Sequence, residues 1–450
     1  MFLACLSQRN LYNSIDVPWP LKNAGERERD VELEPELHAM KTFLILPIIW
    51  ASCFAARSAD WPQFLGPTRN GISPETNLAG AWPKEGPPLV WQKKVGEGFS
   101  GPVVAEGKLI LFHRLADAEV VECLEAKTAR ALWKADCPTG YRDDFGRGDG
   151  PRATPAIADG CVYTFGAEGI LNCWNLASGE KTWRVDTKKQ LSADKGFFGI
   201  SCSPLVEGSA LLLNIGGHEG AGIVGFDKKT GKVLWKTSND EASYSSPVVA
   251  SIGGRRYALF LTRNYLTALE PATGKIFFEF PWRPQIQASV SAATPLVIDD
   301  TIFISASYGA GAALLRFREA GPEKIWSGDG ILSNHYATCV HHAGYLYGFD
   351  GRQEQGCNLR CVESKTGKVK WSKDQFGAGT ITLVNDALLI LTEKGELIRA
   401  PASPVEFKLN ARAQILPFKV RAYPALADGL FYARSEDKLI CVDLRMPTTK

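Results

Sequence analysis

Apolar residues in this chain fall into short runs of strand length, and the runs are separated by Gly, Asp or Asn. In the segment SPVVASIGGRRYALFLT, an apolar run follows Pro247 and leads through a glycine turn into a second run. Runs of this length with breaks at turn residues predict antiparallel β-strands. The pattern starts again at eight places, which are Pro102, Pro155, Pro204, Pro247, Pro295, Cys339, Thr382 and Pro424.

Neighbouring starts lie 42 to 53 residues apart, so the pattern is an internal repeat. A unit of this length holds four short strands, and one such sheet cannot bury both of its faces. Stacking the sheets around an axis buries them against one another. The sequence therefore predicts an all-β protein, an eight-bladed β-propeller of four-stranded antiparallel blades over residues 89–450.

Most repeats close on an aromatic residue, which follows a TG turn in the clearest copies, as in GFDKKTGKVLW, which ends at Trp235. Glycine at this turn is free to take a positive φ. We expect the ring to wedge between neighbouring sheets, where burial of aromatic surface contributes most. The predicted blade-closing residues are Trp91, Trp133, Trp183, Trp235, Phe278, Trp326 and Trp371.

The last repeat, YPALADGLFYARSEDKLICVDL, reaches the end of the chain without a closing aromatic residue. A fourth strand is available upstream, because PLVWQKKV supplies Trp91 before the first repeat begins. We therefore predict that this N-terminal strand closes the ring.

The N-terminal region differs from the repeats in composition. Residues 1–39 carry the charged run GERERDVELEPE, whereas MKTFLILPIIWASCFAARSAD, from Met40, has a lysine, a short apolar stretch and small residues. The second pattern is typical of a secretory signal peptide, with cleavage near Ser58 or Ala59 and export to the periplasm or the medium. An uncleaved anchor behind a cytosolic extension is the alternative. The expected organisation is a misannotated upstream extension over 1–39, a signal peptide over 40–59, an extended segment over 60–88 and the propeller over 89–450.

Charge and cysteine content narrow the classes of function. Charged residues make up 22% of the chain and balance to +2, so neither nucleic acid nor an anionic membrane is an expected partner. Nine cysteines remain beyond the leader, and we expect small buried residues rather than a disulfide framework. No Cys-x-x-Cys pair occurs with a matching His cluster, so the sequence offers no zinc site.

The closing motif, A-x-D-x-x-T-G-x-x-x-W, resembles the tryptophan-docking motif of pyrroloquinoline quinone (PQQ) repeat propellers over most of the mature chain. The segments DWPQFLGPTRNGISPE, GPRATP, YSSPVV and YLYGFDG are most similar to secreted PQQ-like repeat proteins of planctomycetes and related bacteria. More distant resemblances are to the outer-membrane assembly lipoprotein and to quinoprotein alcohol dehydrogenases. The resemblance implies the propeller fold, but fold alone does not choose a function.

In the dehydrogenases, the resemblance implies PQQ over the axis, a calcium ion, a catalytic Asp and a disulfide between adjacent cysteines. No two cysteines are adjacent here, and no Asp or Glu matches the catalytic or calcium positions. We therefore predict a monomeric, non-catalytic binding or scaffold protein without a cofactor, which binds a protein, glycan or small ligand. The alternatives are a PQQ- and calcium-dependent dehydrogenase that oxidises an alcohol or sugar, and a subunit for outer-membrane protein assembly.

Strand order indicates where a ligand would bind. If the first strand of each repeat is innermost, the segments before it and the loops between second and third strands emerge on one face, around the axis. Arginines near aromatic rings on this face would suit an anionic or planar ligand. The alternative for each residue is an ordinary loop role, with Arg152 bonding neighbouring carbonyls. The predicted ligand-binding residues are Asp149, Arg152, Tyr244, Trp282, His335, Tyr336, Arg352 and Arg421.

Overall fold

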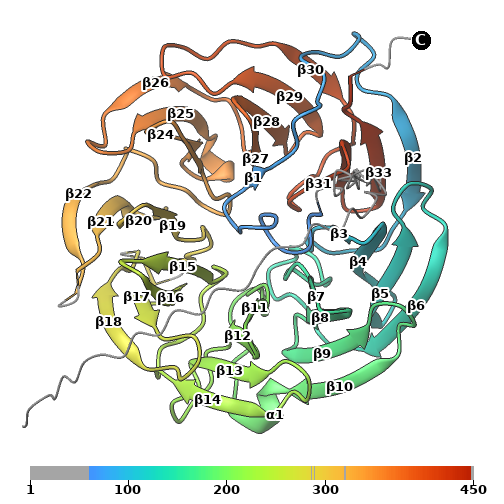
Figure 1. Ribbon diagram of the computed structural model, residues 1–450, viewed down its shortest axis with the longest axis vertical. Coiled ribbons are helices and arrows are strands. Elements are labelled where there is room, and N and C mark those ends of the chain that lie inside the picture. The colour runs from blue at the N-terminus through green and yellow to red at the C-terminus, as the bar shows by residue number, and fades with distance from the viewer. Residues whose placement is uncertain (1–59, 285, 288, 319–320, 447–450) are drawn as a thin grey trace, which may run out of the picture. The chain divides into compact units, whose positions relative to one another are not determined.

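The computed structural model describes residues 60–284, 286–287, 289–318 and 321–446, and it confirms the eight-bladed propeller. Eight antiparallel sheets stand around a central axis (Figure 1). The extension and signal peptide expected over 1–59 lie outside the described residues.

The blades follow one another in chain order. Blade 1 contains β3 (Val103–Ala105), β4 (Lys108–Leu115), β5 (Ala118–Glu125) and β6 (Ala131–Pro138). Blade 2 contains β7 (Ala156–Ala158), β8 (Cys161–Phe165), β9 (Ile170–Asn175) and β10 (Lys181–Asp186). Blade 3 contains β11 (Leu205–Glu207), β12 (Ala210–Asn214), β13 (Ile223–Asp227) and β14 (Val233–Thr237). Blade 4 contains β15 (Val248–Ile252), β16 (Arg255–Leu261), β17 (Tyr265–Leu269) and β18 (Ile276–Pro281).

The second half of the ring repeats this order. Blade 5 contains β19 (Leu296–Ile298), β20 (Thr301–Ala306), β21 (Gly311–Arg316) and β22 (Glu323–Gly328). Blade 6 contains β23 (Val340–His342), β24 (Tyr345–Asp350), β25 (Asn358–Glu363) and β26 (Val369–Lys373). Blade 7 contains β27 (Gly379–Val384), β28 (Ala387–Thr392), β29 (Glu396–Pro401) and β30 (Ala411–Gln414). Blade 8 contains β31 (Ala425–Ala427), β32 (Leu430–Arg434), β33 (Lys438–Asp443) and β2 (Leu89–Lys94).

The first strand of each blade lies innermost, as β3 shows by contacting both β7 and β31 of the neighbouring blades. Seven of the eight predicted starts stand directly before their inner strand. Thr382 is the exception and lies inside β27, because this strand already begins at Gly379. The repeat pattern therefore locates the strands that surround the axis.

The N-terminal strand closes the ring as predicted. Strand β2 pairs antiparallel with β33, and Trp91 lies opposite Cys441. The last blade is thus built from both ends of the propeller, which joins the first and last repeats through a full ladder of backbone hydrogen bonds.

Tryptophans on the outer strands dock each blade onto the next one. The indole of Trp183 in blade 2 donates to the carbonyl of Lys228 in blade 3 at 3.1 Å. A Cβ built on Gly231 of the following TG turn would lie 2.7 Å from the Trp183 ring, so only glycine fits beneath the indole. The indoles of Trp91, Trp133, Trp235, Trp326 and Trp371 make the equivalent bond to their next blade. Phe278 has no N–H and packs on Phe317 instead, 5.5 Å between centroids.

Small residues stand opposite most of these rings on the third strand. Gly225 pairs with Trp235, and Cys123, Cys173 and Cys361 take the same place in other blades. All nine described cysteines are free, and eight of them are buried. The residues that lie opposite an indole are small because a bulky side chain there would collide with the ring.

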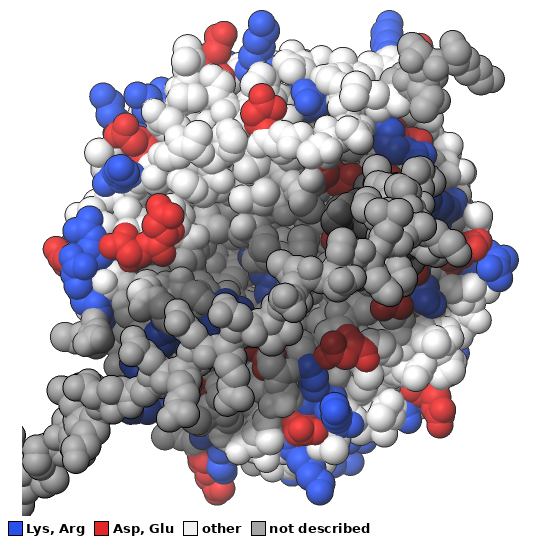
Figure 2. Space-filling model, viewed as in Figure 1, with Lys and Arg blue, Asp and Glu red and all other residues white. Residues whose placement is uncertain are grey.

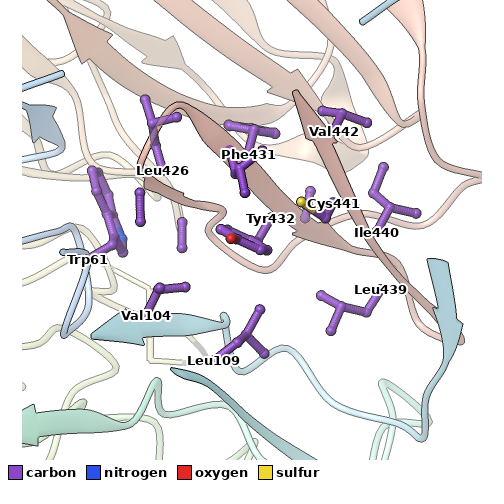
Figure 3. Close-up of a cluster of buried hydrophobic side chains, with 14 of the residues drawn as sticks. Trp61, Val104, Leu109, Leu426, Phe431, Tyr432, Leu439, Ile440, Cys441 and Val442 are labelled. Carbon is purple, nitrogen blue, oxygen red and sulfur yellow. The ribbon is translucent and has the colours of Figure 1, made fainter. Parts of the chain in front are cut away.

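The hydrophobic core lies between neighbouring sheets. At the junction of blades 8 and 1, Tyr432 and Leu439 face Leu109, whereas Phe431 and Ile440 lie on the opposite face of blade 8 (Figure 3). Trp61 joins this cluster from the N-terminal segment, and it is 2% exposed.

Residues 60–73, here called the axial segment, run through the centre of the ring (Figure 1). Trp61 bridges to Val104 of the inner strand β3, and β1 (Ile72–Ser73) pairs in parallel with β27 of blade 7. Between them, the buried Arg69 donates to the carbonyl oxygens of Ser203, Pro204 and Pro247 at 2.9–3.1 Å. The axial segment thereby fills the channel and ties blades 1, 3, 4 and 7 together.

Helical structure is confined, within the described residues, to α1 (Thr187–Leu191) and a 3₁₀ turn η1 (Gln353–Gln355). Neither is long and apolar enough to cross a membrane. On the face shown in Figure 2, basic and acidic side chains are interspersed around the periphery.

Candidate functional site

A cavity of about 220 Å³, here called the axial cavity, opens at one end of the central axis. Phe99, Arg152 and Tyr244 reach it from segments that precede inner strands, and Tyr308 and Gln353 reach it from loops between second and third strands. These are the two groups of connections that strand order places on one face.

Aromatic rings form much of the cavity wall. Phe64 of the axial segment packs on Tyr423 with 5.0 Å between centroids, and Phe198 packs on Tyr244 with 5.8 Å. The rings therefore contact one another in pairs around the cavity, which offers flat apolar surfaces to a ligand. The aromatic residues that line it are Phe64, Phe99, Phe198, Tyr244, Tyr308, Tyr336 and Tyr423.

The structure brings five of the eight predicted ligand-binding residues together in this cavity. They are Arg152, Tyr244, His335, Tyr336 and Arg421. The other three predicted residues do not line the cavity; they are Asp149, Trp282 and Arg352. Their contacts are described below.

Arg152 stabilises the loop over residues 142–150, here called the rim loop. Its guanidinium donates to Asp143 Oδ1 at 3.0 Å and to the carbonyl oxygens of Gly148 and Gly150 at 3.1 Å. Its side chain is 9% exposed. Arg152 thus bonds carbonyls of its own loop, which is close to the ordinary loop role, while its side chain still faces the cavity.

Asp149 belongs to the same loop network. Its Oδ1 accepts the backbone N–H of Asp143 at 2.8 Å, and its Oδ2 lies 3.7 Å from Arg142 Nε. Asp143 in turn accepts the backbone N–H groups of Phe145 and Arg147. These bonds give the rim loop a defined shape, and they leave Asp149 directed into the loop rather than the cavity.

Arg421 and Tyr336 share one carboxylate. Arg421 Nε donates to Glu393 Oε1 at 2.7 Å, and the Tyr336 hydroxyl donates to the same oxygen at 3.1 Å. Burial raises the pKa of Tyr336 well above its usual value, so the phenol stays protonated. The positive charge of Arg421 is therefore already paired within the protein.

His335 is held between two polar side chains. Its Nε2 lies 2.9 Å from the Tyr308 hydroxyl, and its Nδ1 contacts Gln353 Oε1. Because an amide oxygen only accepts, the network assigns the proton to Nδ1 and makes Nε2 the acceptor for Tyr308. Burial lowers the pKa of His335, so the ring is neutral at pH 7.

The remaining two predicted residues lie outside the cavity lining. The guanidinium of Arg352 stacks on the Tyr308 ring, 4.7 Å from its centroid, and so supports a lining residue from behind. Trp282 packs against the hydrophobic cluster that contains Tyr257 and Leu261. The sequence pattern does not separate such a packed tryptophan from one that binds a ligand, since both occur after a blade-closing strand.

Several lining residues were missed by sequence reasoning. Tyr423 stands directly before the start at Pro424, and Thr154, Ser203 and Ser246 occupy the same place in other repeats. The position before each start was therefore a usable signal. Phe64 carries no such signal, because it comes from the axial segment, which has no repeat pattern.

The lining was compared with what a calcium ion requires. Calcium takes six to eight oxygen ligands, often from several carboxylates. Among the described residues, Glu354 supplies the one carboxylate that lines the axial cavity, alongside Arg147, Arg152 and Arg421. No group of three or more His, Cys, Asp or Glu in the described part of the chain forms a metal site. These residues do not fit the calcium site that the dehydrogenase resemblance implies.

Comparison with known proteins gives a family match and two structural neighbours. The family model described as "Outer membrane protein assembly factor BamB" matches residues 117–373. A quinohemoprotein alcohol dehydrogenase of Comamonas testosteroni is 27% identical over 146 residues, which is 30% of this chain and 20% of that protein. The chain therefore spans about a fifth of the length of the curated relatives it matches.

The fold recurs in solved structures, among them the following two. BamB from Moraxella catarrhalis superposes with a TM-score of 0.59 at 13% identity and covers 80% of this chain and 98% of that one. The quinohemoprotein alcohol dehydrogenase of Comamonas testosteroni gives a TM-score of 0.63 at 14% identity. The match covers 87% of this chain and 82% of that one. At these identities, the likeness shows the fold alone.

Proposed function

Because this chain belongs to the family of PQQ-like repeat propellers described as outer membrane protein assembly factor BamB, we propose that it is a non-catalytic binding protein on that scaffold. The axial cavity is the binding site, and its ligand is a planar molecule with an acidic group. One observation carries the proposal: aromatic walls and guanidinium groups meet in a single cavity. Aromatic rings stack on planar ligands, and guanidinium groups bind oxyanions with paired hydrogen bonds.

The state of the ionisable groups supports binding over catalysis. Asp143 is paired with Arg152, and Glu393 is paired with Arg421. The neutral His335 has both ring nitrogens engaged by Tyr308 and Gln353. Groups whose hydrogen-bonding atoms are already engaged can hold neighbouring side chains in place. A general base, in contrast, needs a free lone pair near its substrate.

The dehydrogenase alternative draws on the curated relatives, which are quinohemoprotein alcohol dehydrogenases. The calcium requirement speaks against it here, since one carboxylate lines the cavity. The assembly alternative draws on the description of the matched family. It would place function on an outer surface or sheet edge instead of the axial cavity.

Calorimetric titration of the full chain with PQQ, with and without calcium, tests the proposal. We expect binding that does not depend on calcium, and no turnover in dye-linked oxidation of alcohols or sugars. Phe198→Ala should weaken binding about fivefold, because it removes a stacking surface. Its matched control is Phe197→Ala, which alters the exposed neighbour outside the lining.

Calcium-dependent binding with turnover would overturn the proposal in favour of the dehydrogenase. Failure of PQQ and of simpler planar acids to bind would move the search to protein and glycan partners. Export and a monomeric state remain part of the proposal. Sequencing the N-terminus of protein isolated from cell fractions and measuring its mass in solution test these two points.

A further inference from the structure

Tyr308 has an unusual backbone conformation at the edge of the axial cavity. It lies in the loop between β20 and β21, and its φ is +65°, a region that residues other than glycine rarely adopt. Such residues persist where the surroundings hold them, and they gather at ligand sites. Tyr308 is held by Arg352 over its ring and by His335 at its hydroxyl.

Two arginines near Tyr308 have no carboxylate partner. Among the residues that the structure describes, no carboxylate lies within ion-pair distance of Arg147 or Arg352. Arg152 and Arg421 differ, because both are paired. Burial raises the pKa of Tyr308, and the nearby positive charges of Arg352 and Arg147 oppose that shift.

One acidic group of the protein lies at the same end of the cavity. Glu354 lines the cavity, and its Oε1 accepts a hydrogen bond from Gln353 Nε2 at 2.9 Å. Two guanidinium groups therefore stand against one carboxylate. This leaves one positive charge in excess beside Tyr308, and the protein itself does not neutralise it.

Arg147 is directed to this place by the rim loop. The loop belongs to blade 2, whereas Tyr308 belongs to blade 5, so Arg147 reaches the cavity from the other side of the ring. The hydrogen bond from its backbone N–H to Asp143 Oδ2, at 2.6 Å, fixes the turn that carries it. Its side chain lines the cavity and makes no hydrogen bond or ion pair with any residue that the structure describes, so it remains available to a ligand.

We propose that Arg147 forms a subsite for the acidic group of the ligand, a carboxylate or a phosphate, next to the ring of Tyr308, and that Arg352 adds positive charge from behind that ring. This inference rests on the proposed function and deepens it, because it assigns the acidic end of the ligand to one side of the axial cavity. The planar part then extends toward Phe198 and Tyr244. An oxyanion at this place gains charge-assisted hydrogen bonds from Arg147 and a favourable charge interaction with Arg352.

Three related probes test the subsite: 2-naphthoate, its neutral amide 2-naphthamide, and 2-naphthyl phosphate. Calorimetric titration of the full chain should show naphthoate binding about tenfold more tightly than naphthamide. Arg147→Gln should bring that ratio to within about threefold and leave naphthamide binding unchanged. The comparison of naphthoate with naphthyl phosphate identifies which oxyanion the subsite prefers.

Arg352→Gln should lower the preference by less than Arg147→Gln does, because Arg352 acts through its charge from behind Tyr308, and Arg352→Lys should keep the preference. The matched control is Arg255→Gln, since Arg255 also stacks on an aromatic ring, 5.0 Å from the centroid of Phe277, but lies at the start of β16. It should leave the ratio unchanged.

Equal affinity of the unaltered protein for naphthoate and naphthamide would overturn the subsite and leave the planar-ligand cavity standing. A preference for naphthoate that survives both arginine variants would also overturn it. If none of the three probes binds, the subsite and the proposed function both fail.

Discussion

The indole N–H of Trp91 donates to the carbonyl oxygen of Ala126 at 2.9 Å, so the strand that completes the last blade also docks that blade onto the first one. Trp91 therefore contributes both to the sheet of the last blade and to the junction between that blade and the first one. The same contact recurs around the propeller, but only at this junction does it join the two ends of the repeat array.

Trp91→Phe should destabilise the protein by about 1 kcal/mol, because it removes this hydrogen bond and keeps most of the ring. Phe278 shows that a phenyl ring is accepted at the equivalent place in blade 4. The midpoint of urea unfolding measures the effect. Trp82→Phe is the control, since Trp82 Nε1 has no hydrogen-bond partner among the described residues. Equal losses in both variants would show that the bond to Ala126 contributes nothing.

Gly231→Ala should cost more stability than Gly208→Ala. Both glycines have positive φ, +72° and +57°, so each substitution carries the strain of about 1–2 kcal/mol that L residues meet there. At Gly231 the new methyl group also collides with the Trp183 ring, whereas at Gly208 nothing lies within 4 Å. The extra cost should be about 1–3 kcal/mol. Equal urea midpoints for the two variants would contradict the role of the TG turn as the surface on which the indole packs.

The repeat made the fold predictable because most blades dock onto the next one with a tryptophan at the same position. Starts such as Pro155 mark inner strands, and Trp91 could be assigned to the last blade because that blade lacked a closing ring. The face of the cavity followed from strand order. Tyr244 and His335 were found because they stand in the connections that strand order brings to the axis.

The rest of the cavity depends on contacts that no local pattern reports. Phe64 reaches the lining because the axial segment crosses the channel, where Arg69 bonds the carbonyl of Pro247, 178 residues away in sequence. Asp149 and Arg147 lie two residues apart in an irregular loop, and only its hydrogen bonds decide which of them faces the cavity. Trp282 could not be told from a ligand platform, because its ring is partly buried against residues of its own blade and the next.

Glu119 and Glu122 on β5 should respond to pH with opposite signs. Burial raises the pKa of Glu119 to about 7, so its contribution to stability is present below pH 4.5 and is lost as the pH rises through 7. Glu119→Gln should therefore stabilise the protein at pH 8, by up to about 3 kcal/mol, and much less at pH 4.5. Urea unfolding at both values measures this difference.

Glu122→Gln is the matched comparison from the same strand. Interaction with His113 lowers the pKa of Glu122 to about 2, so its contribution is present above pH 4.5 and is lost as the pH falls through 2. Glu122→Gln should destabilise the protein at pH 8. Loss of stability at pH 8 in both variants would show that Glu119 is stabilised by its neighbours more than burial opposes it.

The Arg421–Glu393 pair separates structural arginines from ligand-binding ones. Its side chains are 17% and 13% exposed, and Tyr336 shares the carboxylate, so Arg421→Gln should cost about 2–3 kcal/mol by leaving Glu393 without a cation. Adding Glu393→Gln should recover part of that loss in unfolding measurements. The more exposed pair of Arg412 and Glu396 serves as the control and should contribute less than about 1 kcal/mol.

The double variant also tests which arginine binds the ligand. If Glu393 neutralises the charge of Arg421, the double variant should bind 2-naphthoate within about threefold of the unaltered protein. Arg147→Gln should instead lose the preference for the acid over the amide. A loss of naphthoate affinity in the double variant as large as that in Arg147→Gln would mean that Arg421 contacts the acidic group itself. The subsite would then lie beside Tyr336, on the blade 7 side of the cavity.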